Sequence, residues 1–119
     1  MKVKNYTNIE QYERATPQAL TAPGVITLTQ LVTTLAVDGT DAYTMAAPRF
    51  AGQFKHIVII SGANTPIANI TVTGMRIPTQ DVWTMATFVA ATAPRAITFY
   101  SPDGIVWDVW ATVGTVTVA

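Results

Sequence analysis

His56 is the only histidine in the 119-residue chain, so it is the first candidate for acid–base chemistry. It alternates with Phe54, Val58 and Ile60 in the stretch QFKHIVIIS, which is typical of a partly buried histidine on a strand. A general base needs polar partners that orient it toward the proton it removes. The sequence around His56 offers no matching set, so we expect no catalytic role for it.

Nucleophiles and metal ligands are equally scarce. The chain has no cysteine, and neither Ser61 nor Ser101 lies in a Gly-x-Ser-x-Gly elbow. One histidine without cysteine is a poor basis for a zinc site. Asp38 and Asp41 flank a turn signal, but calcium needs about six to eight oxygen ligands, so a solvated hairpin tip explains both carboxylates more simply. We therefore expect no metal, no cofactor and no enzymatic activity.

A glycosidase would need a pair of carboxylates, and the candidates are Asp81, Asp103 and Asp108. Asp103 belongs to a Pro-Asp-Gly turn, and Asp108 is most simply an outward residue on the face opposite its neighbour Trp107. The sequence therefore offers no convincing catalytic pair.

Tryptophan is the remaining side chain with a specific binding chemistry, because its ring stacks on sugars and anchors protein interfaces. Trp107 and Trp110 are three residues apart on an expected strand, so they point to opposite faces. One of them is expected in the core and the other on a surface or in a subunit contact. Since tryptophan is enriched at interface hot spots, an exposed ring favours association at least as well as sugar binding.

From Gly24 onward the chain reads as strands separated by turns, with β-branched and alternating residues. Strands are expected over 25–37, 40–46, 53–61, 67–73, 82–90, 96–101 and 105–113. Asp38-Gly39 is a hairpin signal, residues 62–66 (GANTP) form a second turn cluster, and residues 102–104 (PDG) suit a turn that ends in a left-handed glycine. We expect an all-β domain over 24–119, a small antiparallel β-sandwich or jelly roll.

The alternation of apolar residues changes parity near Gln30. Ile26 and Leu28 precede it, whereas Leu31, Leu35 and Val37 follow it. A shift of one residue turns the buried face of a strand over, so we expect a bulge or a strand break at this point.

Residues 1–23 differ in composition from the rest and form an expected N-terminal arm. Thr7 and Glu10 match a capping box, which favours a turn or two of helix over 8–15, and Pro17 would end it. Two interpretations stay open for this stretch. It is either a frayed chain end or an extended arm that folds along a neighbouring subunit.

The composition points to a protein covered by partners. Charged residues make up 12% of the chain, hydrophobic residues 50%, and the net charge is zero, so little electrostatic repulsion opposes association. The longest aliphatic run, Ile57–Ile60, is far too short to span a bilayer, and the N-terminus lacks the apolar core of a signal peptide. Scattered basic residues give no footprint for a nucleic acid.

The ordered pattern over residues 25–114 resembles a β-rich module of virion structural proteins from tailed bacteriophages, notably those of cyanobacterial and marine hosts. Residues 40–45 (TDAYTM) resemble its TDAYTL segment, residues 51–57 (AGQFKHI) its following loop and strand, and residues 98–114 its aromatic hairpin. Two segments depart from the pattern. Residues 75–95 carry more large apolar side chains than the module does, and residues 1–23 have no counterpart in it.

The resemblance implies a non-enzymatic capsid decoration (cement) protein. Such a protein would bind the major capsid protein on the outer surface of the head, most simply as a homotrimer. A tail or fibre component, or a glycan-binding module with loops 46–53 and 62–66, is the alternative. The candidate contacts between copies are Trp83, Met85, Phe88, Trp107 and Trp110. The candidate capsid-binding residues of the arm are Lys2, Lys4, Tyr6, Tyr12 and Arg14.

Overall fold

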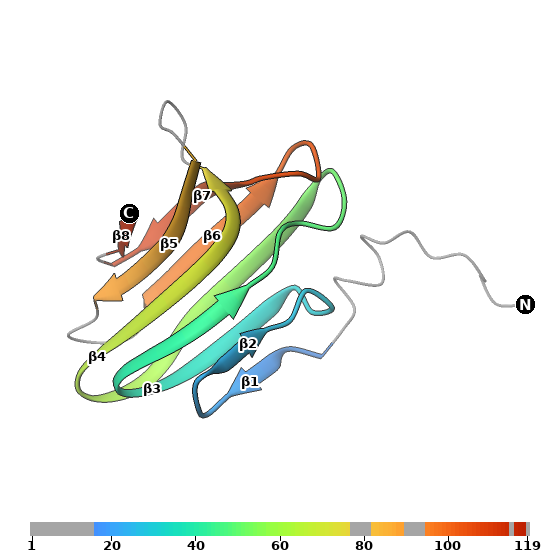
Figure 1. Ribbon diagram of the computed structural model, residues 1–119. Helices are drawn as coiled ribbons and strands as arrows, with labels where there is room; N and C mark the ends of the chain where they lie inside the picture. The colour runs from blue at the N-terminus through green and yellow to red at the C-terminus, as the bar shows by residue number, and fades with distance from the viewer. Residues whose placement is uncertain (1–15, 77–81, 90–94, 115, 119) are drawn as a thin grey trace, which may run out of the picture.

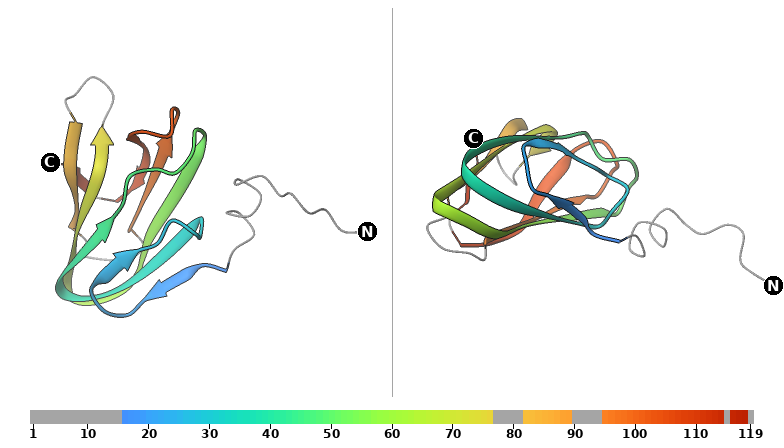
Figure 2. Two further views of the ribbon diagram at one scale, coloured as in Figure 1. Left: turned by 45° about the vertical axis from the view of Figure 1, so that its right-hand side comes forward. Right: turned by 90° about the horizontal axis from the view of Figure 1, so that it is seen from below.

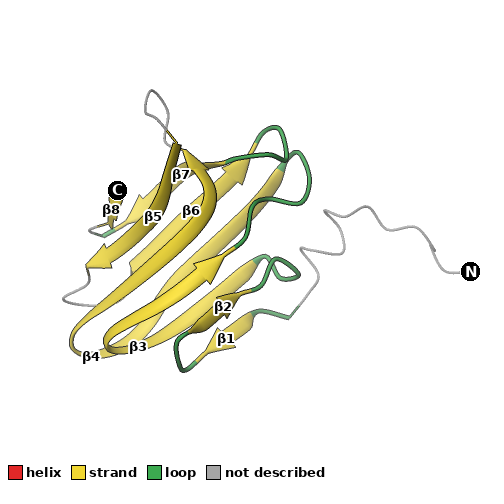
Figure 3. Ribbon diagram, in the orientation of Figure 1, coloured by secondary structure: helices red, strands yellow, loops and turns green. Residues whose placement is uncertain are grey.

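The computed structural model describes residues 16–76, 82–89, 95–114 and 116–118, and within these it describes the backbone alone at 38, 61–66, 82–89 and 116–118. The described chain is all-β and contains no helix (Figure 1, Figure 3). Its strands are β1 (Gln18–Leu20), β2 (Gly24–Ile26), β3 (Val32–Met45), β4 (Gln53–Arg76), β5 (Val82–Val89), β6 (Arg95–Ser101), β7 (Trp107–Val113) and β8 (Val116–Val118).

The two long strands, β3 and β4, each bend in the middle and fold back over themselves (Figure 1). Shifts of register between Leu35 and Ala36, and again between Asp38 and Thr40, mark the bend of β3. Gly39 adopts a φ of 78°, which glycine reaches without the penalty that a Cβ imposes. Each long strand therefore contributes one half to each of two facing layers.

Strand pairing defines the two layers. Layer A contains β1, residues 32–37 of β3, residues 53–59 of β4, β6 and β7. Layer B contains β2, residues 40–45 of β3, residues 67–76 of β4, β5 and β8. All eight strands belong to one sheet, which is nearly closed into a barrel (Figure 2). Closure comes from the pairing of Met75 and Arg76 at the end of β4 with Trp107 and Asp108 at the start of β7.

The expectation of an all-β fold is confirmed, but two expected turns are wrong. Asp38-Gly39 does not close a hairpin, because β3 runs through it, and residues 62–66 lie within β4. Both turn signals instead fall where a strand folds over. Because β3 is bent in the middle, its two ends lie on the same side of the molecule. β4 therefore begins on the side where β3 began and runs in the same direction, so the two strands pair in parallel. The sheet is therefore mixed rather than antiparallel, with the returning half of β3 as the crossover.

Three other expectations hold. The parity change near Gln30 corresponds to the break between β2 and β3, over residues 27–31. The pairing of β6 with β7 is antiparallel, as expected for a hairpin around residues 102–104. Gly104 has a φ of 76°, in the left-handed region.

Within the stretch expected as an arm, β1 pairs with β3 and so belongs to the sheet, whereas residues 1–15 lie outside the described part of the chain.

One hydrophobic core lies between the two layers. Layer A contributes, among others, Leu35, Ile57 and Phe99, and layer B contributes Tyr43 and Ile70. Alternation along the strands places these side chains inward, and the largest of the buried side chains is Trp107. Its indole Nε1 donates a hydrogen bond to the carbonyl oxygen of Ala46 at 2.9 Å, which ties β7 to the loop that connects β3 to β4.

Candidate interaction surface

Three aromatic rings from three neighbouring strands meet on the outer side of layer A. Phe54 of β4, Tyr100 of β6 and Trp110 of β7 form what we call the aromatic cluster. Ring centroids are 4.6 Å apart for Phe54 and Tyr100, 5.0 Å for Tyr100 and Trp110, and 5.8 Å for Phe54 and Trp110. These separations and the tilted or edge-to-face arrangements are those that aromatic pairs prefer. Trp110 nevertheless remains 63% exposed.

Alternation on β4 explains why the cluster faces outward. Gln53, Lys55 and Ile57 point into the molecule and are fully buried, so Phe54 and His56 between them point out. Phe54 is directly opposite Tyr100 in the antiparallel ladder. Cross-strand neighbours of this kind are close enough for their rings to touch.

A β-bulge aims Trp110 at the other two rings. The register between β6 and β7 shifts between Thr98 and Phe99, so that Ala111 is opposite Thr98 and Val109 opposite Phe99. Trp110 is the extra residue between these two pairs and has no partner in the register. Bulges redirect a side chain in this way and increase the local twist of the strand.

The outer face of layer A carries almost no charge. Its outward side chains include Thr34, Val58 and Thr98 beside the aromatic cluster, and Ile60 and Val113 are exposed toward the bend. His56 accepts or donates a hydrogen bond at 2.9 Å between Nδ1 and the hydroxyl of Thr98. Burial, and then the positive charge of Lys55, lowers the pKa of His56, so its ring is neutral at pH 7.

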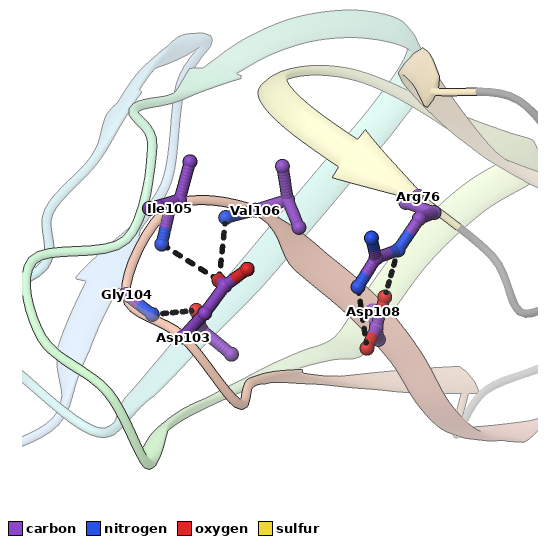
Figure 4. A network of polar contacts seen from close by, with 7 residues as sticks. Arg76, Asp103, Gly104, Ile105, Val106 and Asp108 are labelled. Atoms are coloured by element: carbon purple, nitrogen blue, oxygen red, sulfur yellow. Dashed lines mark hydrogen bonds and ion pairs between the residues drawn. The ribbon is translucent and has the colours of Figure 1, made fainter.

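The carboxylate of Asp108 lies at one end of this face and is paired. Arg76 Nε donates to Asp108 Oδ1 at 2.9 Å, and the Arg76 guanidinium also reaches the second oxygen at 3.5 Å (Figure 4). The pair joins the end of β4 to the start of β7, where the sheet closes. Because the Asp108 charge is offset locally, the face as a whole presents apolar and neutral polar groups.

The neighbouring turn is built by Asp103. Its Oδ1 accepts hydrogen bonds from the amides of Ile105 at 2.8 Å and Val106 at 3.1 Å (Figure 4). These backbone hydrogen bonds hold the pKa of Asp103 below its ordinary value. Ser101 Oγ accepts from the amide of Gly104 at 2.9 Å. Asp103 therefore has a turn-building role, as the sequence predicts.

The structure separates the predicted site residues into three groups. Trp107 is fully buried and Trp110 is exposed, as expected for two rings on opposite faces, which leaves Trp110 as the candidate contact of this pair. The predicted contacts Trp83, Met85 and Phe88 lie on β5, whose side chains fall outside the described part of the structure. The predicted arm residues Lys2, Lys4, Tyr6, Tyr12 and Arg14 fall outside it as well.

Sequence reasoning missed Phe54 and Tyr100 as partners of Trp110. The sequence contained only part of the information needed to find them. Phe54 was placed on the face of His56 by alternation, but the pairing of β4 with β6 and the bulge at Trp110 are tertiary features. It also missed Lys55, which is fully buried although lysine is almost always exposed.

Other chemistry has little support in the described residues. Among them, no group of three histidine, aspartate or glutamate side chains lies close enough to hold a metal ion. They also contain no helix that is long and apolar enough to cross a membrane. Comparison of the chain with protein-family models, with curated proteins and with solved structures finds no match.

Proposed function

We propose that this protein is a non-enzymatic attachment protein of a virus particle, a capsid decoration protein that joins its own copies through the outer face of layer A. The observation that carries the proposal is the aromatic cluster of Phe54, Tyr100 and Trp110 on an almost uncharged sheet face. The assignment to a phage capsid rests on the sequence resemblance. We also propose that the folded sheet is a β-sandwich or jelly roll, and the single core between its two layers supports this description.

The chemistry of this face suits contact with protein. Tyrosine and tryptophan carry much of the binding energy in interfaces, and charged residues are depleted at interface centres. Trp110 offers the exposed ring, while Phe54 and Tyr100 hold it in place from the side. The net charge of zero leaves little repulsion between copies.

A trimer of such copies would bind the major capsid protein through three equivalent arms. Residues 1–15 precede β1 in the sequence, and β1 lies at the edge of layer A opposite to β7 and Trp110. Weak contacts that are linked in this way gain strength from their high effective concentration. The account therefore separates self-association, in the sheet, from capsid binding, in the arm.

The second candidate function is binding of a neutral glycan at the same cluster. Its support is the position of the Arg76–Asp108 pair at the start of β7, because Tyr100 is directly opposite Asp108. Stacking aromatic rings beside groups that hydrogen-bond hydroxyls is the usual composition of a sugar site. A tail or fibre location remains compatible with either function.

Co-expression with the major capsid protein encoded in the same genome tests the proposal. We expect the protein to sediment with assembled heads, and we expect Trp110→Ser to lower its occupancy by tenfold or more through loss of avidity. Val25→Ser is the matched control, because Val25 is 62% exposed on the outer side of layer B. Absence of the protein from the heads contradicts the capsid proposal. Binding of polysaccharides that Trp110→Ser abolishes, without head binding, establishes the glycan function instead.

A further inference from the structure

Lys55 is a buried amine at a junction between the core and the N-terminal part of the sheet. Its side chain has no exposed surface. Nζ donates hydrogen bonds to the carbonyl oxygen of Gln30 at 2.8 Å and to the hydroxyl of Thr33 at 2.7 Å. Two acceptors match the two N–H bonds of a neutral amine, whereas an ammonium group has three to satisfy.

Among the described side chains, no carboxylate compensates an ammonium at this position. The depression of the Lys55 pKa, to about 7, has burial as its cause. The described titratable groups on the elements around Lys55 either point to the outer face or lie farther along the sheet. They are His56 and Tyr100 on the outer face, Arg76 at the far end of β4, Arg95 at the start of β6, Asp41 and Tyr43 in layer B, and Arg49 in the loop after β3.

The acceptors of Lys55 belong to a polar network that fastens residues 18–31, which we call the N-terminal ribbon. Thr33 Oγ1 donates to Gln18 Oε1 at 2.8 Å, and the amide of Thr27 donates to the same oxygen at 3.0 Å. Gln18 Nε2 donates to the carbonyl oxygen of Val25 at 3.0 Å. The ribbon pairs with β3 through only three residues in each of β1 and β2.

The ribbon is the element that must move for water to reach the amine on the side of its acceptors, because Gln30 belongs to the ribbon and Thr33 is hydrogen-bonded to it. Along its own strand Lys55 is flanked by Ile57 and by the polar side chain of Gln53, and across the ladder it is opposite Phe99; all three are fully buried. Gln30 belongs to the connecting loop 27–31, in which Thr27 and Thr29 donate hydrogen bonds to Gln30 Oε1 and Leu28 is buried against the core.

We propose that Lys55 is a proton-sensitive latch: the neutral amine holds the N-terminal ribbon against β3 and β4, and protonation of the amine releases the ribbon. The proposal stands independently of the attachment function. Release would free the edge of β3, so the latch couples the pH of the surroundings to the exposure of that edge.

The difference in the Lys55 pKa between the open and closed states determines how ribbon opening changes with pH, and over which pH range. In the open state the amine is hydrated and titrates near its ordinary value of about 10.5, and in the closed state it titrates near 7. Opening is therefore greatest at and below about pH 7 and falls as the pH rises toward 10. Between pH 7.5 and 9.5 the opening constant should fall about 70-fold. This window avoids the titration of His56 below it and of Tyr43 above it.

A thiol-labelling experiment tests the latch, because the chain has no cysteine of its own. Leu28→Cys places a reporter at a buried position of the ribbon, and Val72→Cys places one in the core of layer B. Labelling rates are corrected for thiolate content with a free peptide thiol. We expect the reporter at 28 to react faster than the reporter at 72, with an opening constant that falls about 70-fold from pH 7.5 to 9.5.

Lys55→Met in the Leu28→Cys background should remove this pH dependence, and Lys4→Met, which deletes the same charge outside the described residues, should leave it. Equal labelling at positions 28 and 72 overturns the latch, because opening would then be global. A pH-independent rate at position 28, or a profile that Lys55→Met leaves unchanged, also overturns it. If Lys55→Met does not fold, titration of the lysine side chains by NMR decides: a midpoint for Lys55 near 10 contradicts the proposal.

Discussion

Trp107 and Trp110 lie three residues apart on β7 and on opposite sides of the sheet, with Trp107 fully buried and Trp110 63% exposed. Trp107 is packed edge-on against Phe99 and is hydrogen-bonded to Ala46, whereas Trp110 lies beside Phe54 and Tyr100 on the outer face. One strand thus supplies both the largest side chain of the core and the most prominent side chain of the proposed interface. The two roles make separable predictions.

Trp107→Phe should lower stability and leave self-association intact. The substitution removes the hydrogen bond to the carbonyl of Ala46 and leaves a small cavity beside Phe99. We expect a loss of about 1–3 kcal/mol in the free energy of unfolding, measured by urea denaturation. An unchanged midpoint would mean that the indole of Trp107 is not packed as described.

Trp110→Ser should weaken self-association and leave the stability of the isolated chain nearly unchanged. Because the ring is mostly exposed, the loss of its contacts with Phe54 and Tyr100 should cost the isolated chain no more than about 1 kcal/mol. Denaturation at a protein concentration where the chain is monomeric measures this cost. A loss of several kcal/mol would identify Trp110 as a structural residue and not as a contact.

Gly104→Ala should destabilise the protein strongly for its size. Gly104 has a φ of 76°, and a Cβ there would lie 2.8 Å from the amide nitrogen of Ala51 and 2.9 Å from the carbonyl carbon of Phe50. Both obstacles are backbone atoms, so the two loops would have to separate. We expect a loss of about 2 kcal/mol or more, measured by thermal or urea unfolding. Gly39→Ala is the matched control, since Gly39 also has a positive φ but would meet no atom within 4 Å.

The stability of the whole domain should rise with pH between about 7 and 9.5. Lys55 has a lower pKa in the folded chain than in the unfolded chain, so across this range the unfolded state binds more protons. The gain should approach about 1.4 kcal/mol per pH unit and should be absent in Lys55→Met. Urea denaturation at several pH values measures it. A flat profile for the unsubstituted protein would show that Lys55 is solvated.

The sequence predicts the faces of individual strands better than their connections. Alternation placed Phe54 and His56 on one face of their strand, because period two is a local property of the chain, but it did not say that this face points outward. The sequence analysis made no prediction for Lys55, whose charge argues against burial, and only the acceptors at Gln30 and Thr33 explain how it is accommodated. Those acceptors come from another strand and a distant loop.

The bends of β3 and β4 were beyond sequence reasoning for a different reason. Asp-Gly is a hairpin signal because it favours positive φ, and Gly39 does adopt positive φ. Whether such a glycine closes a hairpin or folds a strand over depends on which strand pairs next. In this chain the neighbour is β4, which runs parallel, so the two halves of β3 separate into different layers.

The most direct test of the central claim is the solution mass of the protein by light scattering, compared with those of Trp110→Ser and Val25→Ser. If the outer face of layer A joins copies of the chain, the unsubstituted protein and Val25→Ser should have about three times the chain mass of 12.8 kDa, and Trp110→Ser should have the monomer mass. A monomeric unsubstituted protein, or a Trp110→Ser variant that remains fully assembled, would contradict the claim.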